Sequence, residues 1–425
     1  MAITTHNNTD AVIFIPDMGN HIGVDLFAER FAAELDRNTL SAHVSYDVVR
    51  SGDDKHYQSG ISKTDMEPVR SIIRNNGENK NKVADIYYFE YAKTLRNVWA
   101  RKNNFKKSMM LFFTLINLYY KLFCSFFTVR SKRLSEQFQI AYAMLLMLFL
   151  SIYMIIVIIA VAGVVKSVIP SLGIEISKWT SNIKIEDPLN ILVVYSGHFV
   201  IISALIKSFV PDYQKTFTSM VESLMGVIDY ISLGEYKDII AGRFADMLDY
   251  ISSNNYERIH VVSYSMGSVI ALDNIFPYGD SPSLRVNNIY SLTTIGCPYD
   301  FIRLFWGYYF EGRGMLKDVP IQWLNVYSPS DILGSNFRDD AENEEADHSV
   351  SIKKMGDSYY NDEKIGPIPE NIVFTGGINI KGILQWFSFF GIRNHGVYFE
   401  DNECIEKGCL SGIIHKLYAG KPILA

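Results

Sequence analysis

The chain has 425 residues, of which 48% are hydrophobic and 13% aromatic, and this composition excludes an intrinsically disordered protein. Its 46 acidic and 40 basic residues leave a net charge of −6, so no polyanion-binding surface is indicated and nucleic acid is not an expected partner. Only 20% of the residues are charged and the mean hydropathy is +0.06, which is high for a soluble enzyme.

Short strand-like and helix-like patterns alternate in the first hundred residues. The apolar run 11–15, which ends at Pro16, predicts a strand, and the apolar spacing over 24–35 predicts a helix. Residues 43–49 and 84–91 have the pattern of further strands. This alternation indicates an α/β sheet covered by helices.

The excess of apolar residues is concentrated in the middle of the chain. Residues 108–129 are apolar but include Lys121, residues 137–165 carry no charge over 29 positions, and residues 188–206 are uncharged over 19. About 20 apolar residues cross a bilayer. We therefore expect a membrane-associated helical insertion at 101–210.

This insertion separates two halves of one α/β domain, 1–100 and 211–425. If both halves build one sheet, they lie on one side of the membrane and the number of crossings is even. Basic clusters at 101–107 and 130–133 flank the first apolar segment, and the positive-inside rule puts them in the cytoplasm. The first segment is then interfacial or re-entrant, while the second and third cross as a hairpin. The alternative is that the first and third segments are lid or core helices of a soluble enzyme.

The α/β alternation resumes after about residue 235. Residues 236–253 place their apolar side chains on one face of a helix, and 259–264, 289–295 and 321–327 have the pattern of buried strands. The four cysteines, Cys124, Cys297, Cys404 and Cys409, are scattered and predict reduced thiols rather than a disulfide or metal framework, although a bridge between Cys404 and Cys409 stays open.

The most informative motif follows the strand at 259–264. Ser263, Ser265 and Gly267 alternate at the point where the strand pattern changes into a helix pattern. Small residues two positions before and after a serine allow the sharp strand-to-helix turn of a nucleophile elbow. A helix that begins at such a turn also stabilises developing negative charge. Ser265 is therefore the predicted nucleophile, and an ordinary turn with serines is the alternative.

A serine hydroxyl needs a base to take its proton and an acid to orient that base. Asp331 follows the predicted strand 321–327 and is the expected acid, with Asp300 as the competing candidate. Three histidines come later in the chain. His395 stands on a polar turn and is the expected base, whereas His348 lies in an acidic loop and His415 in a helical pattern.

The oxyanion of a tetrahedral intermediate needs two backbone N–H donors. Met266, directly after the nucleophile, is the first expected donor. The loop after the first strand, where Met18 is the best candidate, supplies the second.

Together these motifs resemble the α/β-hydrolase superfamily, and within it the membrane-associated lipases and phospholipases. The block S-Y-S-M-G-S-V-I-A-L-D resembles their G-H-S-L-G-S-V-I, T-I-G-C-P resembles their T-x-G-S-P, and N-V-Y-S-P-S-D-I-L-G is similar to the segment that bears their acid. His395 with Tyr398 resembles their H-x-x-Y ending. Ser263 departs from the usual glycine. The resemblance implies an α/β-hydrolase fold and ester hydrolysis through an acyl-enzyme, with no metal or cofactor.

The sequence therefore predicts a multi-pass membrane protein, with its catalytic domain in the cytoplasm, that cleaves acyl esters of a membrane lipid. Two alternatives remain: a non-catalytic membrane scaffold or signalling protein with a hydrolase fold, and a thioesterase or acyl-protein hydrolase. The oligomeric state stays open.

Overall fold

The structure is a computed structural model of the chain. It describes the strands and helices of the α/β sheet, the start of the apolar middle region and the loops around the sheet; the described residues are 9–19, 22–39, 43–50, 68–77, 79–103, 106–107, 109–110, 113–114, 116–121, 151, 222–223, 225–233, 235–278, 284–310, 313, 321–331, 333–338, 345–346, 350, 367–375, 395–399 and 408–418.

The backbone contacts divide the chain into two compact units. The first consists of Met1–Val98, Val129–Gln139 and Gly226–Ala425. The second consists of Trp99–Thr128 and Ile140–Met225. The first unit holds the whole sheet and all the side chains that the motifs single out.

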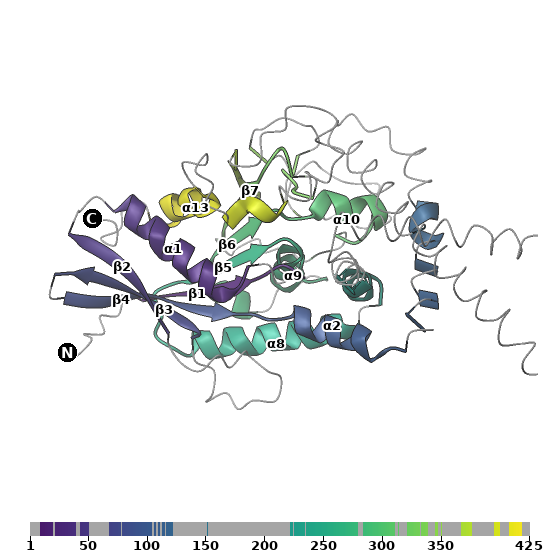
Figure 1. Ribbon diagram of the computed structural model, residues 1–425, viewed down its shortest axis with the longest axis horizontal. Helices are drawn as coiled ribbons and strands as arrows, with labels where there is room; N and C mark the ends of the chain where they lie inside the picture. Colours follow the sequence, from purple (N-terminus) through teal and green to yellow (C-terminus); the bar gives the residue numbers. More distant parts are fainter. Residues whose placement is uncertain are drawn as a thin grey trace, which may run out of the picture. The chain divides into compact units, whose positions relative to one another are not determined.

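The first unit alternates strands and helices in chain order. The elements are β1 (Asp10–Ile15), α1 (Val24–Asn38), β2 (Val44–Arg50), β3 (Arg70–Asn76), β4 (Asn79–Tyr88), α2 (Ala92–Arg101, whose last turn belongs to the second unit), α8 (Glu235–Ser252), β5 (Ile259–Tyr264), α9 (Met266–Ile275), β6 (Ile289–Ile295), α10 (Tyr299–Phe305), β7 (Gln322–Tyr327), β8 (Glu370–Val373) and α13 (Cys409–Tyr418). Figure 1 labels most of them. The prediction of an α/β fold is confirmed.

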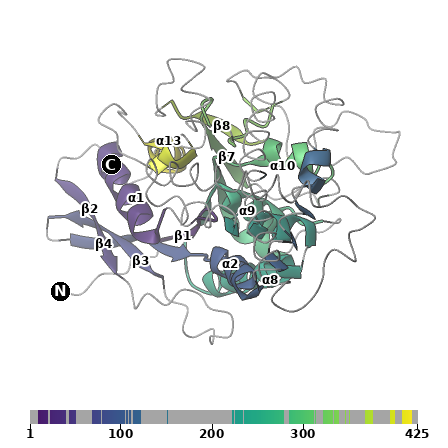
Figure 2. The same cartoon turned by 45° about the vertical axis from the view of Figure 1, so that its right-hand side comes forward.

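The eight strands in the described part of the chain form one sheet in the order β2-β3-β4-β1-β5-β6-β7-β8. Figure 2 labels the edge strands β2 and β8. The five pairs from β4 to β8 are parallel, whereas β3 runs antiparallel to both of its neighbours. The pairing of β1 with both β4 and β5 brings the two halves of the chain into the same sheet. The parallel strands therefore end at one edge, where the loops that follow them meet.

Most of the predicted strands lie where the apolar runs placed them, with boundaries that differ by a few residues. The strand expected at 84–91 is the exception, since β4 begins at Asn79 and ends at Tyr88. Its first half is polar and exposed where it pairs with β3, so no apolar run marked it. The strands β3 and β8 were not predicted, because β3 has only two apolar residues and β8 is four residues long.

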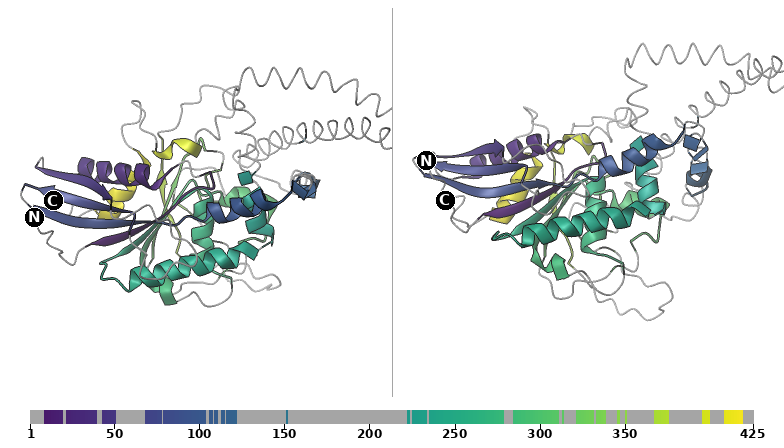
Figure 3. Two further views of the ribbon diagram at one scale, coloured as in Figure 1. Left: turned by 60° about the horizontal axis from the view of Figure 1, so that its bottom comes forward. Right: turned by 90° about the horizontal axis from the view of Figure 1, so that it is seen from below.

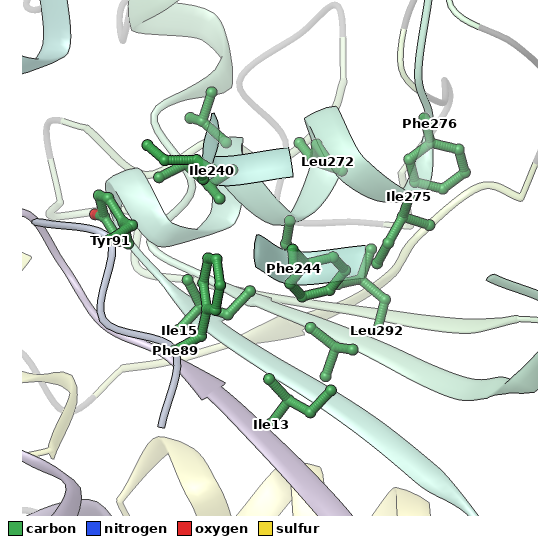
Figure 4. Close-up of a cluster of buried hydrophobic side chains, with 14 of the residues drawn as sticks. Ile13, Ile15, Phe89, Tyr91, Ile240, Phe244, Leu272, Ile275, Phe276 and Leu292 are labelled. Atoms are coloured by element: carbon green, nitrogen blue, oxygen red, sulfur yellow. The ribbon is translucent and has the colours of Figure 1, made fainter. Parts of the chain in front are cut away.

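Two hydrophobic cores cover the two faces of the sheet, and β1 contributes alternately to both. Ile13 and Ile15 pack in the core with α8 and α9 (Figure 4), and Val12 and Phe14 pack in the core with α1 and α13. The Phe14 ring stacks on Phe27 of α1 with centroids 4.1 Å apart. Side chains alternate across a strand, so a wholly buried strand such as β1 needs helices on both faces (Figure 3).

A cluster of buried polar side chains connects the amino end of β1 with α13. Asp10 accepts a hydrogen bond from Arg258 Nη2 at 2.5 Å, and Arg258 also donates to the carbonyl of Leu417 in α13. Burial alone raises the pKa of Asp10, but the hydrogen bonds from His260 and Arg258 outweigh burial, so the pKa lies below its ordinary value. The cluster holds α13 against the sheet.

In the described ranges, no helix combines the length and the apolar character that a bilayer span requires. The expected crossing segments 137–165 and 188–206 lie outside these ranges, apart from Ser151.

Candidate active site

Ser265 stands at the sharp turn between β5 and α9, with φ 55° and ψ −124°. A non-glycine residue at positive φ costs about 1–3 kcal/mol and persists only where the surroundings impose it. Two backbone hydrogen bonds do so here: the Ser265 N–H donates to the Ile295 carbonyl at 2.8 Å, and the Ser265 carbonyl accepts from the Ser268 N–H at 2.9 Å. This backbone conformation places Ser265 just beyond the carboxyl end of β5, between the strand and α9.

Gly267 allows α9 to begin directly behind the loop that follows β1. A Cβ atom at this position would lie 2.4 Å from the carbonyl oxygens of both Ile15 and Pro16. These are backbone atoms of a buried strand end, so they cannot move aside. The glycine of the motif is therefore required by close packing.

Ser263 occupies the position at which the α/β-hydrolase motif has glycine, and the structure accommodates its side chain. Its side chain is fully buried and donates a hydrogen bond to the Thr293 carbonyl at 2.9 Å. Its φ is not positive, since Ser265 and Phe337 are the described non-glycine residues with positive φ. The departure from glycine therefore does not prevent the turn.

The three residues predicted to act together are in contact. His395 Nε2 lies 2.7 Å from Ser265 Oγ, and His395 Nδ1 lies 2.8 Å from Asp331 Oδ2. With the proton on Nδ1, the imidazole donates to the carboxylate and presents Nε2 as an acceptor to the serine hydroxyl. The Asp331 side chain is fully buried, whereas Ser265 is half-buried.

Neighbouring side chains hold the imidazole of His395. Its ring stacks on Tyr264 with centroids 5.5 Å apart, and the Tyr264 hydroxyl donates to the His395 carbonyl. Gly296, at φ +54°, lies beneath the ring, where a Cβ atom would be 3.1 Å from His395 Cε1 and 3.2 Å from Asp331 Oδ2. The base is thus packed from two sides.

Asp331 accepts two further hydrogen bonds besides the contact with His395. The Tyr398 hydroxyl donates to Oδ2 at 2.8 Å, and the Leu333 N–H donates to Oδ1 at 2.9 Å. The Tyr398 hydroxyl in turn accepts from the Ser328 N–H at 2.9 Å. Burial and the nearby Asp331 carboxylate raise the pKa of Tyr398 well above its ordinary value, so it remains a donor.

Two of the alternatives to Asp331 and His395 lie in other surroundings. Asp300 accepts a hydrogen bond from Ser335 Oγ at 2.6 Å and sits at the start of α10. His415 is exposed in the last turn of α13, and His348 lies outside the described residues. Sequence reasoning noted Tyr398 through the H-x-x-Y spacing but missed its bond to the acid, because that bond depends on how two loops meet.

The two expected oxyanion donors lie on either side of the close contact at Gly267. Met266 is the first residue of α9, and the first N–H groups of a helix have no acceptor within it. Met18 is buried in the loop after β1, whose turn is closed by a hydrogen bond from the Gly19 N–H to Asp17 Oδ2 at 3.0 Å. The loop therefore passes directly over the start of α9.

A buried carboxylate anchors the far half of α9. Asp273 accepts hydrogen bonds from the hydroxyls of Tyr230 at 2.8 Å and Tyr309 at 2.5 Å, and it pairs with Lys237 Nζ at 3.0 Å and with Arg313. Burial alone raises the pKa of Asp273, but the charges of Arg313 and Lys237 outweigh burial and lower it. The helix behind Ser265 is thus fixed at both ends.

No group of three or more His, Cys, Asp or Glu residues in the described part of the chain could hold a metal ion. Comparison of the chain with family models, with curated proteins and with solved structures finds no match.

Replacing Gly267 with Ala should disrupt the turn at Ser265. The added methyl group overlaps two backbone carbonyls, so we expect the free energy of unfolding to fall by at least about 1–3 kcal/mol. We also expect Ser265 to lose its reactivity. The matched control is Gly242→Ala in α8, where a Cβ atom meets nothing within 4 Å. The free energy of unfolding of this control should rise by about 1 kcal/mol. Denaturant melting of both variants measures the difference, and equal effects would refute the steric argument.

Replacing Tyr398 with Phe removes one donor from Asp331 and leaves the Ser328 N–H without its acceptor. We expect a loss of about 1–3 kcal/mol in unfolding free energy. A less firmly held acid should also slow phosphonylation of Ser265 by a fluorophosphonate about 10- to 100-fold.

Tyr91→Phe is the control for this variant. Tyr91 is equally buried, but its hydroxyl has no hydrogen-bond partner in the region that the structure describes. Its loss should leave stability nearly unchanged. If Tyr398→Phe reacted at the unaltered rate, the hydroxyl would have no part in positioning Asp331.

Proposed function

We propose that this protein is a serine hydrolase of the α/β-hydrolase fold that cleaves acyl ester bonds of lipids, with phospholipids as the first candidates. The observation that carries the proposal is the continuous chain of contacts from Ser265 Oγ through His395 to Asp331. The strained turn at Ser265 adds support, because backbone strain in a folded protein is concentrated at functional positions.

In the acylation step, Ser265 Oγ attacks the carbonyl carbon of the ester while its proton passes to His395 Nε2. Asp331 stabilises the imidazolium that results. The N–H groups of Met18 and Met266 donate to the tetrahedral oxyanion. The intermediate collapses, the bond to the alcohol breaks, and His395 gives its proton to the departing oxygen, which leaves an acyl ester on Ser265.

In the deacylation step, a water molecule takes the place of the alcohol. His395 Nε2 accepts a proton from the water as its oxygen attacks the acyl carbon, and the same two N–H groups hold the second oxyanion. Collapse of this intermediate releases the fatty acid and returns the proton to Ser265 Oγ. No metal or cofactor takes part in either step.

The membrane part of the proposal comes from the sequence. The uncharged segments 137–165 and 188–206 are proposed to cross the bilayer as a hairpin, with the hydrolase domain in the cytoplasm. The single sheet formed by both halves of the chain supports an even number of crossings. An enzyme held in this way meets its lipid substrate at high local concentration.

Alkaline carbonate extraction tests the membrane placement. Full-length protein expressed in cells should stay in the membrane pellet after this treatment, because a hairpin that crosses the bilayer is not released by breaking electrostatic contacts. Recovery of the protein in the supernatant would contradict the crossing segments and favour the alternative of lid or core helices.

Replacing Ser265 with Ala tests the hydrolase. The variant should lose labelling by a fluorophosphonate probe, and its release of fatty acid from phospholipid vesicles should fall by at least about 10³-fold. The control is Ser268→Ala, which removes a buried hydroxyl bonded to the Ser263 carbonyl one turn along α9. This control should keep its labelling.

The outcomes separate the alternative functions. A native chain that does not react with the probe would be a scaffold, and unchanged lipolysis in Ser265→Ala would refute the assignment of the nucleophile. A chain that reacts with the probe and hydrolyses acyl thioesters, but not lipid esters, would keep the mechanism and change the substrate.

A further inference from the structure

The basic residues of this chain are unevenly distributed, and one segment contains no acid at all. Between Glu90 and Glu136 there are ten lysines and arginines and no aspartate or glutamate, although the whole chain has a net charge of −6. Such a segment is attracted to negatively charged surfaces. Six of the ten cations precede the first apolar segment, and four of these stand directly before it: Arg101, Lys102, Lys106 and Lys107.

The described residues between 106 and 121, all in the second unit, are helical. Asn103 caps this helix, because its side chain accepts from the Lys106 N–H at 2.7 Å and its carbonyl accepts from the Lys107 N–H at 2.9 Å. The described basic residues therefore cluster at the beginning of this helical segment.

Five large apolar side chains are exposed along this helical segment, and Tyr119, at 39%, is one of them. The other four are spaced four, three and four residues apart: Met109, Phe113, Ile116 and Tyr120, with exposed fractions of 39%, 60%, 51% and 69%. At about 100° per residue these four share one face. Leu118, on the opposite face, is 7% exposed, so the protein already covers that side. We call the four exposed side chains the apolar stripe.

The lysines at the start of this helical segment precede the apolar stripe in the chain. Lys106 is exposed, and Lys102 and Lys107 lie over the ring of Trp99, with Nζ 5.3 and 5.9 Å from its centroid. An indole ring that holds two ammonium groups concentrates positive charge at one end of the segment.

We propose that this helix lies in the surface of an anionic bilayer, with the apolar stripe among the acyl chains and Lys102, Lys106 and Lys107 on the lipid phosphates. An exposed apolar face beside a cluster of cations matches the two attractions that hold interfacial helices, hydrophobic burial and charge. Without acids, the segment has no repulsion to offset them. This inference rests on the membrane placement proposed above and not on catalysis by Ser265.

The test places an environment-sensitive fluorophore on the stripe of the full-length chain. All four native cysteines are replaced by Ala, Ile116→Cys is labelled with a nitrobenzoxadiazole dye, and Ser265→Ala is included to prevent lipid turnover. The protein is reconstituted into vesicles of neutral phosphatidylcholine, or of phosphatidylcholine with 30% phosphatidylserine as a chosen composition. A label at Asn255, on the exposed turn after α8, is the control.

We expect the emission at position 116 to shift to the blue in the anionic vesicles, and the shift to weaken as salt screens the charges. Lys106→Gln with Lys107→Gln should lower the ratio of buried to exposed label about 30-fold, from about fivefold per lysine at an anionic surface. Lys80→Gln with Lys416→Gln, which removes the same charge elsewhere, should have no effect.

Three results would overturn the inference. Equal emission in neutral and anionic vesicles would remove the role of charge, and emission that stays water-like in both would show that the stripe does not enter the bilayer. A blue shift without lipid that grows with protein concentration would show that a second copy covers the stripe. The Ser265→Ala background keeps each of these results independent of the hydrolase assignment, which is tested by probe labelling of the native serine.

Discussion

The contact between Gly267 and the carbonyls of Ile15 and Pro16 is the constraint on which the proposed site depends. It lets α9 start directly against the end of β1, next to the turn at which Ser265 has a positive φ. The strain of a positive φ is tolerated because β1, β5 and β6 are buried and paired around it. The absence of a side chain at Gly267 thus determines where the proposed nucleophile, Ser265, lies.

The rest of the site is assembled from loops that follow the parallel strands. β5 leads to Ser265, β6 to Gly296 and β7 to Asp331, while His395 comes from a turn much later in the chain. Tyr398 links the last two, because its hydroxyl contacts both Asp331 and the backbone at Ser328. The relay is therefore supported by groups that would not react themselves, which keeps the base and the acid in one arrangement.

The proposed lipid hydrolysis and the proposed membrane binding of the apolar stripe are physically compatible. A hydrolase for lipid esters must reach a substrate that stays in a bilayer, and a helix with an apolar face and basic residues at its start would hold the protein at that surface. The two proposals rest on separate observations: one on the contacts around Ser265, the other on exposure and charge in the second unit. Each proposal is therefore tested by a separate measurement.

The sequence by itself determined the α/β alternation and the strand-to-helix turn at Ser265, because apolar periodicity and small residues at a turn are local properties. Only the tertiary structure placed Asp331 in contact with His395 and Asp300 in contact with Ser335, since 64 residues of chain separate Asp331 from His395 and their contact depends on how β7 and the last loops pack. The short strands β3 and β8 and the bond from Tyr398 to Asp331 also required it. Edge pairing and loop contacts leave no periodic pattern in a sequence, because each is set by residues far away along the chain.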